Sequence, residues 1–154
     1  MGCYTLIKTQ KIPASLNEVW DFISSPANLK KITPAYMGFD IKKPELPAKM
    51  YPGMIIKYNI TPLLGIKMLW VTEITHVSEY EFFVDEQRIG PYSLWHHQHR
   101  LEKTDDGVLM TDIVNYKPPL GFFGDIANSI IIKKQLQKIF DYRFEAMEKV
   151  FGQF

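Results

Sequence analysis

Three of the four histidines in the chain lie within residues 90–101, next to a tryptophan. Successive side chains of a β-strand point to opposite faces, so every second residue of such a segment shares one face. The odd-numbered face contains Trp95, His97, His99 and Leu101. Because the opposite face includes Gln98 and Arg100, we expect the odd-numbered face to point into the protein.

A second alternating face follows in residues 108–116, and its members are Met110, Asp112, Val114 and Tyr116. The intervening Asp105-Asp106-Gly107 is a turn signal and predicts a hairpin. With Leu101 paired to Met110, His99 lies opposite Asp112 inside an aromatic pocket. A carboxylate beside an imidazole favours its charged form or holds one tautomer, which suits acid–base catalysis. His99 and Asp112 are therefore candidate catalytic residues; the simpler interpretation is that they only satisfy each other's hydrogen bonds in the sheet interior.

The same residues can be read as a metal site. His97, His99 and Asp112 form a two-histidine, one-carboxylate set, the ligand type of non-haem iron sites. Histidines two positions apart are common in strands, however, and no second carboxylate or further spacing motif supports the set. We therefore expect no metal ion and no cofactor.

Arg143 lies on the apolar stripe of the predicted C-terminal helix, between Phe140 and Met147. A guanidinium in that position must reach water, pair with a buried acid or bind an anionic ligand such as a carboxylate. Asp85 and Gln87 lie two residues apart in a predicted strand. The pattern leaves open whether these two side chains face the interior or the solvent.

Hydrophobic period and turn signals divide the chain into strands and helices. Extended residues 4–12 are followed by Ser15 and Glu18, which have the spacing of a capping box for a helix that begins at Leu16. A second short helix is expected at about residues 27–32. Six strands of period two are predicted at residues 38–42, 54–61, 66–77, 81–88, 93–103 and 108–116. A helix of period 3.6 is expected from Asp125 to about residue 151.

This order of elements predicts one α+β domain over residues 1–154. A sheet of about seven antiparallel strands has a face to bury and one long helix to cover it. The sheet should therefore curve around that helix, while the two short helices after the first strand close one end. Where the curve is too wide for side chains to fill, an apolar cavity of ligand size remains.

Composition restricts the classes of partner. With 46% hydrophobic and 14% aromatic residues, a chain of this length buries a core without disulfides. The net charge is +1 without a run of Lys or Arg, so no nucleic-acid partner is expected. No apolar run approaches the roughly 20 residues that span a bilayer, so no integral membrane association is expected. The single cysteine, Cys3, is what a reducing cytoplasm tolerates, and we expect a cytoplasmic protein.

Residues 118–124 read Pro-Pro-Leu-Gly-Phe-Phe-Gly and place apolar side chains beside glycines. The segment is either a mobile lip over the mouth of the cavity or a tightly packed connection into the last helix. Phe122 and Phe123 also offer a surface to another protein.

Two series of residues resemble a known group of proteins. The N-terminal series is Ile12-Pro13-Ala14, Val19-Trp20-Asp21-Phe22, Asn28-Leu29 and Ile32-Thr33-Pro34. The second series is Gly90-Pro91-Tyr92, Trp95, His97, His99, Met110, Asp112, Val114, Tyr116, Pro119, Gly121, Gly124 and Ile139-Phe140-Asp141-Tyr142-Arg143. Asp85-Glu86-Gln87 lies between the two series and also matches. The first resembles the SRPBCC superfamily, the helix-grip group that includes START lipid-binding domains and polyketide cyclases. The second resembles its stand-alone bacterial ligand-binding members, described as cell-division-inhibitor-like. The resemblance implies a helix-grip fold with a hydrophobic small-molecule site between helix and sheet, and no agreed reaction.

Three functions follow as hypotheses. The first is binding of a lipid-like, aromatic or polyketide-like small molecule, with these candidate contacts: Trp70, Trp95, His97, His99, Asp112, Tyr116, Phe140, Arg143 and Met147. The second is a cyclase or dehydratase, with His99 as general base, Asp112 orienting it and Arg143 stabilising negative charge. The third is a protein-interaction module that uses Phe122 and Phe123.

Overall fold

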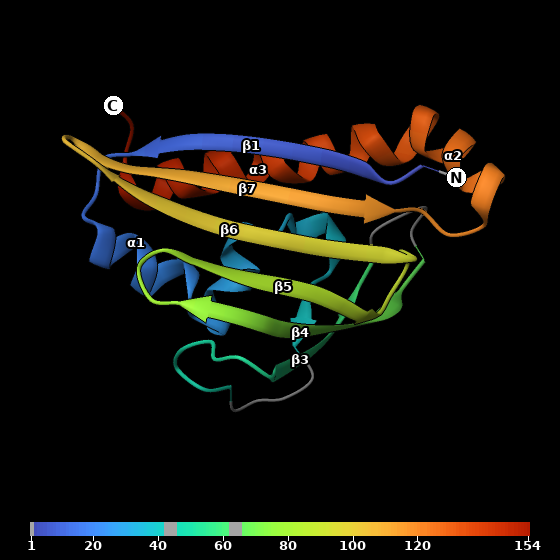
Figure 1. The fold of residues 1–154 in the computed structure, drawn as a ribbon, viewed down its shortest axis with the longest axis horizontal. Coiled ribbons are helices and arrows are strands. Elements are labelled where there is room, and N and C mark those ends of the chain that lie inside the picture. The colour runs from blue at the N-terminus through green and yellow to red at the C-terminus, as the bar shows by residue number, and fades with distance from the viewer. Residues whose placement is uncertain (1, 42–45, 62–65) are drawn as a thin grey trace.

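Seven strands form a single antiparallel sheet in the computed structural model, which describes residues 2–41, 46–61 and 66–154 (Figure 1). The strands are β1 (Tyr4–Ile12), β2 (Asp40–Ile41), β3 (Met54–Ile60), β4 (Met68–Ser78), β5 (Phe82–Ile89), β6 (Leu94–Thr104) and β7 (Gly107–Lys117). From β2 to β7 each strand pairs with the next in sequence, and β1 pairs with β7 at the opposite edge. The predicted meander is confirmed. Of the strand expected at residues 38–42, only β2 is observed, and residue 42 lies outside the described residues.

The helical elements are α1 (Leu16–Ile23), the 3₁₀ helices η1 (Pro26–Ile32) and η2 (Ala35–Met37), and a C-terminal series of α2 (Gly121–Ala127), η3 (Asn128–Ile132) and α3 (Lys133–Phe151). Helix α3 runs along the sheet and contacts β1, as Figure 1 shows. The first helices contact both layers, α1 against β6 and η1 against α3. The architecture is thus one sheet folded around one long helix, with short helices between them.

The capping box predicted from sequence forms at the start of α1. The side chain of Ser15 accepts a hydrogen bond from the backbone N–H of Glu18 at 3.3 Å, and the Glu18 carboxylate accepts from the backbone N–H of Ser15 at 2.9 Å. Two amides that a helix start leaves without partners are thereby satisfied. The helix then buries Val19, Trp20 and Ile23 against the sheet.

The C-terminal helix differs from the single rod expected from Asp125 onward. The helical run begins at Gly121, and the five residues of η3 form a π-helical turn before α3 starts. Two sets of contacts hold α2 independently of α3: Asp125 accepts hydrogen bonds from the Gly2 amide and the Tyr4 hydroxyl, and Asn128 accepts one from Tyr116. The wider π turn lets α2 make these contacts while α3 keeps its apolar face on the sheet.

The connection between β7 and α2 is packed at Pro118 and Gly124. Pro118 is buried, Leu120 adopts the left-handed conformation at φ 66°, and a Cβ on Gly124 would overlap the carbonyl oxygen of Pro119. Pro119 and Leu120 between them are exposed, Leu120 at 80%, so the choice between a packed connection and a lip over the cavity stays open. Phe122 and Phe123 also point outward, with exposed fractions of 70% and 73%.

Candidate functional site: a histidine–carboxylate cluster on an aromatic cavity

A cavity of about 140 Å³ lies between the inner face of the sheet, the short helices and the C-terminal helical run. Its aromatic lining comprises Phe39, Tyr58, Trp70, Tyr92, Trp95 and Phe140. Its aliphatic lining comprises Leu29, Ile32, Met37, Ile60, Ile132, Leu136 and Ile139. The polar lining is Thr33, Asp85, His97, His99, Gln135 and Arg143. Of these, Asp85, His97, His99 and Arg143 converge on one part of an otherwise largely apolar wall, which is the usual composition of a small-molecule site.

The aromatic wall is a connected set of ring contacts. Trp70 and Trp95 meet edge to face with their ring centroids 5.3 Å apart, and Tyr92 lies 5.0 Å from Trp95. Tyr58 stacks on Trp70 at 6.2 Å. Because edge-to-face and offset contacts are the favourable geometries for aromatic pairs, these rings hold one another in place and keep the wall rigid.

The turn that carries Tyr92 is fixed by Gln87. The Gln87 side-chain amide donates to the backbone carbonyl of Tyr92 at 2.6 Å and accepts from its backbone N–H at 3.1 Å. A Cβ on Gly90 would overlap the Gln87 side chain, so only glycine leaves room for this clasp. The sequence left open which way the Gln87 side chain points. Its amide bonds to the backbone of Tyr92 and so positions one wall of the cavity.

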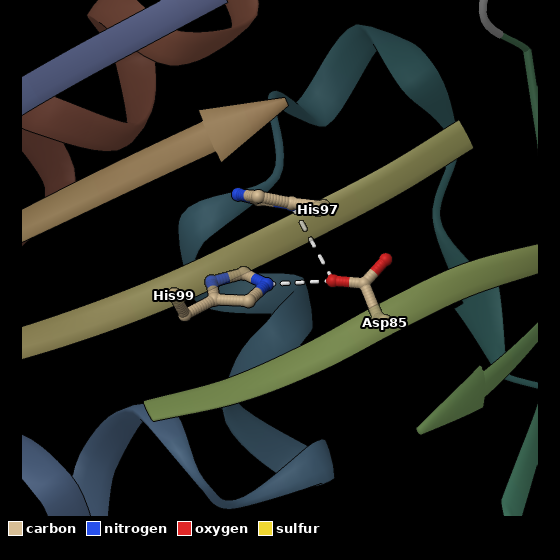
Figure 2. A group of neighbouring side chains, drawn as sticks. All are labelled: Asp85, His97 and His99. Atoms are coloured by element: carbon tan, nitrogen blue, oxygen red, sulfur yellow. Dashed lines mark hydrogen bonds and ion pairs between the residues drawn. The ribbon is translucent and has the colours of Figure 1, made fainter. Parts of the chain in front are cut away.

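Asp85, His97 and His99 meet at the polar end of the cavity (Figure 2). Nε2 of His99 lies 2.6 Å from Oδ2 of Asp85, and Nδ1 of His97 lies 3.4 Å from the same oxygen. Oδ1 of Asp85 accepts a hydrogen bond from the indole N–H of Trp95 at 3.3 Å. Both imidazoles are buried, with exposed fractions of 6% and 3%. Asp85 therefore faces inward, the alternative that the sequence pattern could not decide.

A second carboxylate, Asp112, lies on the other side of the two imidazoles. Its Oδ1 is 2.8 Å from Nε2 of His97 and 3.2 Å from Nδ1 of His99. Arg143 donates from Nε to Oδ2 of Asp112 at 3.1 Å and from Nη2 to Nδ1 of His99 at 3.1 Å. Arg143 therefore pairs with a buried acid, one of the three roles that the sequence allowed.

The electrostatics of the cluster keep both carboxylates ionised. Burial alone would raise the pKa of Asp112, but the charge of Arg143 and hydrogen bonds from both histidines outweigh it and hold the pKa well below its usual value. Burial would likewise raise the pKa of Asp85, and the two histidines together with Trp95 lower it overall. Burial and the neighbouring His99 lower the pKa of His97 despite both carboxylates. At neutral pH His97 is therefore a neutral imidazole between two anions.

The structure brings most of the candidate contacts together. Those that line the cavity are Trp70, Trp95, His97, His99, Phe140 and Arg143. Asp112 lies behind the histidines and holds them through hydrogen bonds. Tyr116 and Met147 lie elsewhere: Tyr116 packs beside Val114 and bonds to Asn128, whereas Met147 belongs to the core around Trp20.

The predicted register of the hairpin is confirmed, with His99 opposite Asp112 and Trp95 opposite Tyr116. The hydrogen bonding nevertheless differs from the pair expected there. The shortest contact of Asp112 runs to His97, and the shortest contact of His99 runs across to Asp85 on β5. The isolated His99–Asp112 pair is therefore replaced by a cluster of five residues, in which Asp85 is the member that sequence reasoning did not place. Its one signal was its position two residues after Phe83, on the inward parity of β5.

Comparisons with known proteins support the fold and no more. Neither the family models nor the curated proteins include a match to the chain. The structure of CV1439 from Chromobacterium violaceum is 14% identical, with 97% of this chain and 99% of that one covered and a TM-score of 0.71. TTHA0849 from Thermus thermophilus is also 14% identical, with 95% of both chains covered and a TM-score of 0.70. Ginseng major latex-like protein 151 from Panax ginseng is 15% identical, with 97% of both chains covered and a TM-score of 0.70.

These likenesses extend over nearly the whole chain, and they define its class as the α+β helix-grip fold. Within the described residues, no helix has both the length and the apolar character needed to cross a membrane.

Proposed function

We propose that the protein binds a hydrophobic small molecule of lipid-like, aromatic or polyketide-like character in this cavity. The observation that carries the proposal is an apolar, mainly aromatic cavity with a few convergent polar groups. Apolar cavities of about 150 Å³ in other proteins stay dry and accept a molecule the size of benzene. The volume of about 140 Å³ therefore suits one ring or a short acyl segment without rearrangement.

Arg143 lines the cavity, and the sequence offered it as an anchor for an anionic ligand. Arg143 is a weaker anchor for a carboxylate than the sequence implied, because Asp112 and His99 already engage its Nε and Nη2.

Membership of the SRPBCC superfamily, in its stand-alone bacterial ligand-binding subgroup, belongs to the same proposal. Its support is the helix-grip fold together with the second series of matching residues, in which His97, His99 and Arg143 line the cavity. A cytoplasmic location remains a proposal supported by cysteine content alone, since Cys3 is the single cysteine.

Native mass spectrometry with a panel of lipids, quinones and polyketides tests the binding function. The wild-type protein should retain at least one class of compound. Ile139→Trp places an indole in the cavity and should abolish retention, whereas Lys138→Trp adds the same side chain at an exposed position and should leave it unchanged. A panel from which folded wild-type protein retains nothing, or retention by Ile139→Trp equal to that of Lys138→Trp, would contradict the proposal.

A second candidate function is an enzyme of the cyclase or dehydratase type. It is favoured by the two imidazoles that line the cavity between two ionised carboxylates, because such contacts fix the tautomer of a general base. His99 would be the base, oriented by Asp85 and Asp112. Once a substrate is found, His99→Ala should lose turnover while the fold persists, and His96→Ala, on the opposite face of β6, should keep it. Full activity in His99→Ala would exclude this role.

The interaction module remains a third hypothesis. Leu120, Phe122 and Phe123 are exposed, but nothing in the structure indicates what covers them.

A further inference from the structure

The two imidazoles of the cluster are held in matching orientations. The outer nitrogens, Nε2 of His97 and Nδ1 of His99, both face Oδ1 of Asp112 at 2.8 and 3.2 Å. The inner nitrogens, Nδ1 of His97 and Nε2 of His99, both face Oδ2 of Asp85 at 3.4 and 2.6 Å. Figure 2 marks both contacts with dashed lines. One carboxylate therefore orients the rings from behind, and their other nitrogens converge with a second carboxylate at the cavity.

Hydrogen bonds do not account for every contact in this arrangement, because one nitrogen and one oxygen face each other with no proton between them. A neutral imidazole carries one N–H, and the short contact to Asp112 places that of His97 on Nε2. Its Nδ1 then presents a lone pair to Oδ2 of Asp85, so two acceptors face each other at 3.4 Å. A cation between them removes the conflict, because both lone pairs then point at positive charge.

We propose that Asp85, His97 and His99 bind one divalent transition-metal ion at the polar end of the cavity. One ligand atom from each residue lies within 4.8 Å of the other two. Bonds of about 2.1 Å to a tetrahedral ion separate its ligand atoms by about 3.4 Å. The distance from Nδ1 of His97 to Oδ2 of Asp85 already has that value, at 3.4 Å. Nε2 of His99, at 2.6 Å, has to move away from Oδ2 by less than about 1 Å as the metal replaces the hydrogen bond.

Asp112 would support the ion without binding it. A carboxylate on the outer nitrogen of a metal-binding histidine fixes the tautomer and makes the ring a better ligand. Asp112 provides this contact to His97, and Arg143 holds Asp112 in place. In His99 the proton lies on Nε2, because Nδ1 accepts a hydrogen bond from Arg143. Metal binding at Nε2 moves that proton to Nδ1, which then donates to Asp112 and gives up the bond from Arg143. The sequence-based set of His97, His99 and Asp112 lacked a second carboxylate; the structure supplies it and makes Asp85 the ligand.

The donor set and charge define the class of ion and of the fourth ligand. Two imidazoles and one carboxylate suit Zn²⁺, Fe²⁺ or Co²⁺, whereas Mg²⁺ and Ca²⁺ prefer oxygen ligands. Three protein ligands leave a position open toward the cavity. The two negative charges of Asp85 and Asp112 cancel the two positive charges of the ion. The charge of Arg143 then leaves the site with one net positive charge, which favours an anionic oxygen ligand at the open position.

Titration of chelator-treated protein with Co²⁺ and Zn²⁺ tests the site directly. One equivalent of Co²⁺ should give the visible absorption of a tetrahedral or five-coordinate ion, and calorimetry with Zn²⁺ should give one site. Asp85→Asn and His99→Gln should each weaken binding at least 100-fold, and Asp112→Asn should weaken it 10–100-fold. His96→Gln is the matched control, because His96 lies on the opposite face of β6 beside Glu86, and it should leave affinity unchanged.

X-ray absorption of the zinc-loaded wild type identifies the ligands of the ion and does not depend on the folding of any variant. It should show two imidazole nitrogens and at least one oxygen bound to zinc. Folded wild-type protein that binds neither ion, binding that His96→Gln abolishes, or a zinc spectrum without imidazole would each overturn the proposal. The titration uses no organic ligand, so its failure would leave the binding function of the cavity intact.

Discussion

At the scale of single residues, loss of one member of the buried ion pair between Arg143 and Asp112 should cost much of the free energy of unfolding. Arg143 is 7% exposed on α3, and its charge is balanced by Asp112, which is 2% exposed. Removal of one partner from a buried ion pair leaves the other charged in a medium of low polarity and costs about 3–5 kcal/mol, far more than the net stabilisation by the intact pair.

Arg143→Met should therefore lower the free energy of unfolding by about 3–5 kcal/mol, measured by urea denaturation. Asp141→Asn, on the same helix as Arg143, breaks the exposed pair with Lys8 of β1 and should change stability by less than about 1 kcal/mol. The double variant Arg143→Met with Asp112→Leu should be more stable than the sum of its single changes predicts. Equal losses for Arg143→Met and Asp141→Asn would show that the buried pair has no special role.

The same residues show how far sequence reasoning reaches at this scale. Parity along β6 and β7 and the Asp-Asp-Gly turn were enough to predict which side chains face inward and which lie opposite one another. They do not determine which carboxylate each imidazole contacts, because strand twist brings diagonal neighbours and residues of a third strand within reach. Asp85 reaches His99 across the pairing of β5 with β6, a pairing that the pattern within one hairpin does not contain.

At the scale of elements, the π turn η3 ties the sheet to the C-terminal helical run. Asn128 is 3% exposed at the first position of η3, and its side-chain oxygen accepts a hydrogen bond from the Tyr116 hydroxyl on β7 at 2.9 Å. The helix predicted from the sequence continued through this region without a break, because the spacing of its apolar residues does not indicate the extra residue of a π turn. The cause is tertiary, since the contacts of Asp125 and Asn128 set the position of α2.

The hydrogen bond between Tyr116 and Asn128 can be removed by changing either residue, and each change should lower stability. Asn128→Ala leaves the buried Tyr116 hydroxyl without its partner and should cost about 1–3 kcal/mol in the free energy of unfolding. Tyr116→Phe should cost a similar amount. Because both remove the same bond, the double variant should cost less than the sum of the two. Strict additivity would mean that this hydrogen bond does not hold η3.

Helix α1 offers a simpler prediction, since its capping box could be read from the sequence. Ser15→Ala removes the oxygen that accepts from Glu18 and should lower the free energy of unfolding by about 1 kcal/mol. Ser15→Thr keeps that oxygen and should lose less than half as much. If thermal unfolding shows equal losses for the two variants, the cap does not stabilise α1.

At the scale of the whole molecule, the strand order and the covering helix followed from periodicity and turns, whereas the cavity did not follow in detail. Whether a curved sheet is filled depends on the summed volumes of side chains from five or more elements. The prediction included Met147, which fills core space beside Trp20, and missed Tyr58 and Tyr92, which line the cavity. A helical stripe shows which side of α3 is apolar, but not how far each residue lies from the void.

Occupancy of the cavity should stabilise the entire fold, because a ligand there contacts the sheet, η1 and α3 at once. Binding only to the folded state at a ligand concentration 100 times the dissociation constant adds about 2.7 kcal/mol. For a chain of 154 residues this corresponds to a rise in Tm of about 5–10 °C.

Scanning calorimetry with a retained compound should show that rise in the wild type and in Lys138→Trp. Ile139→Trp should show none, because its indole occupies the same space. An equal rise in Ile139→Trp would place the compound on the outer surface, where the exposed Phe122 and Phe123 would be the first positions to examine.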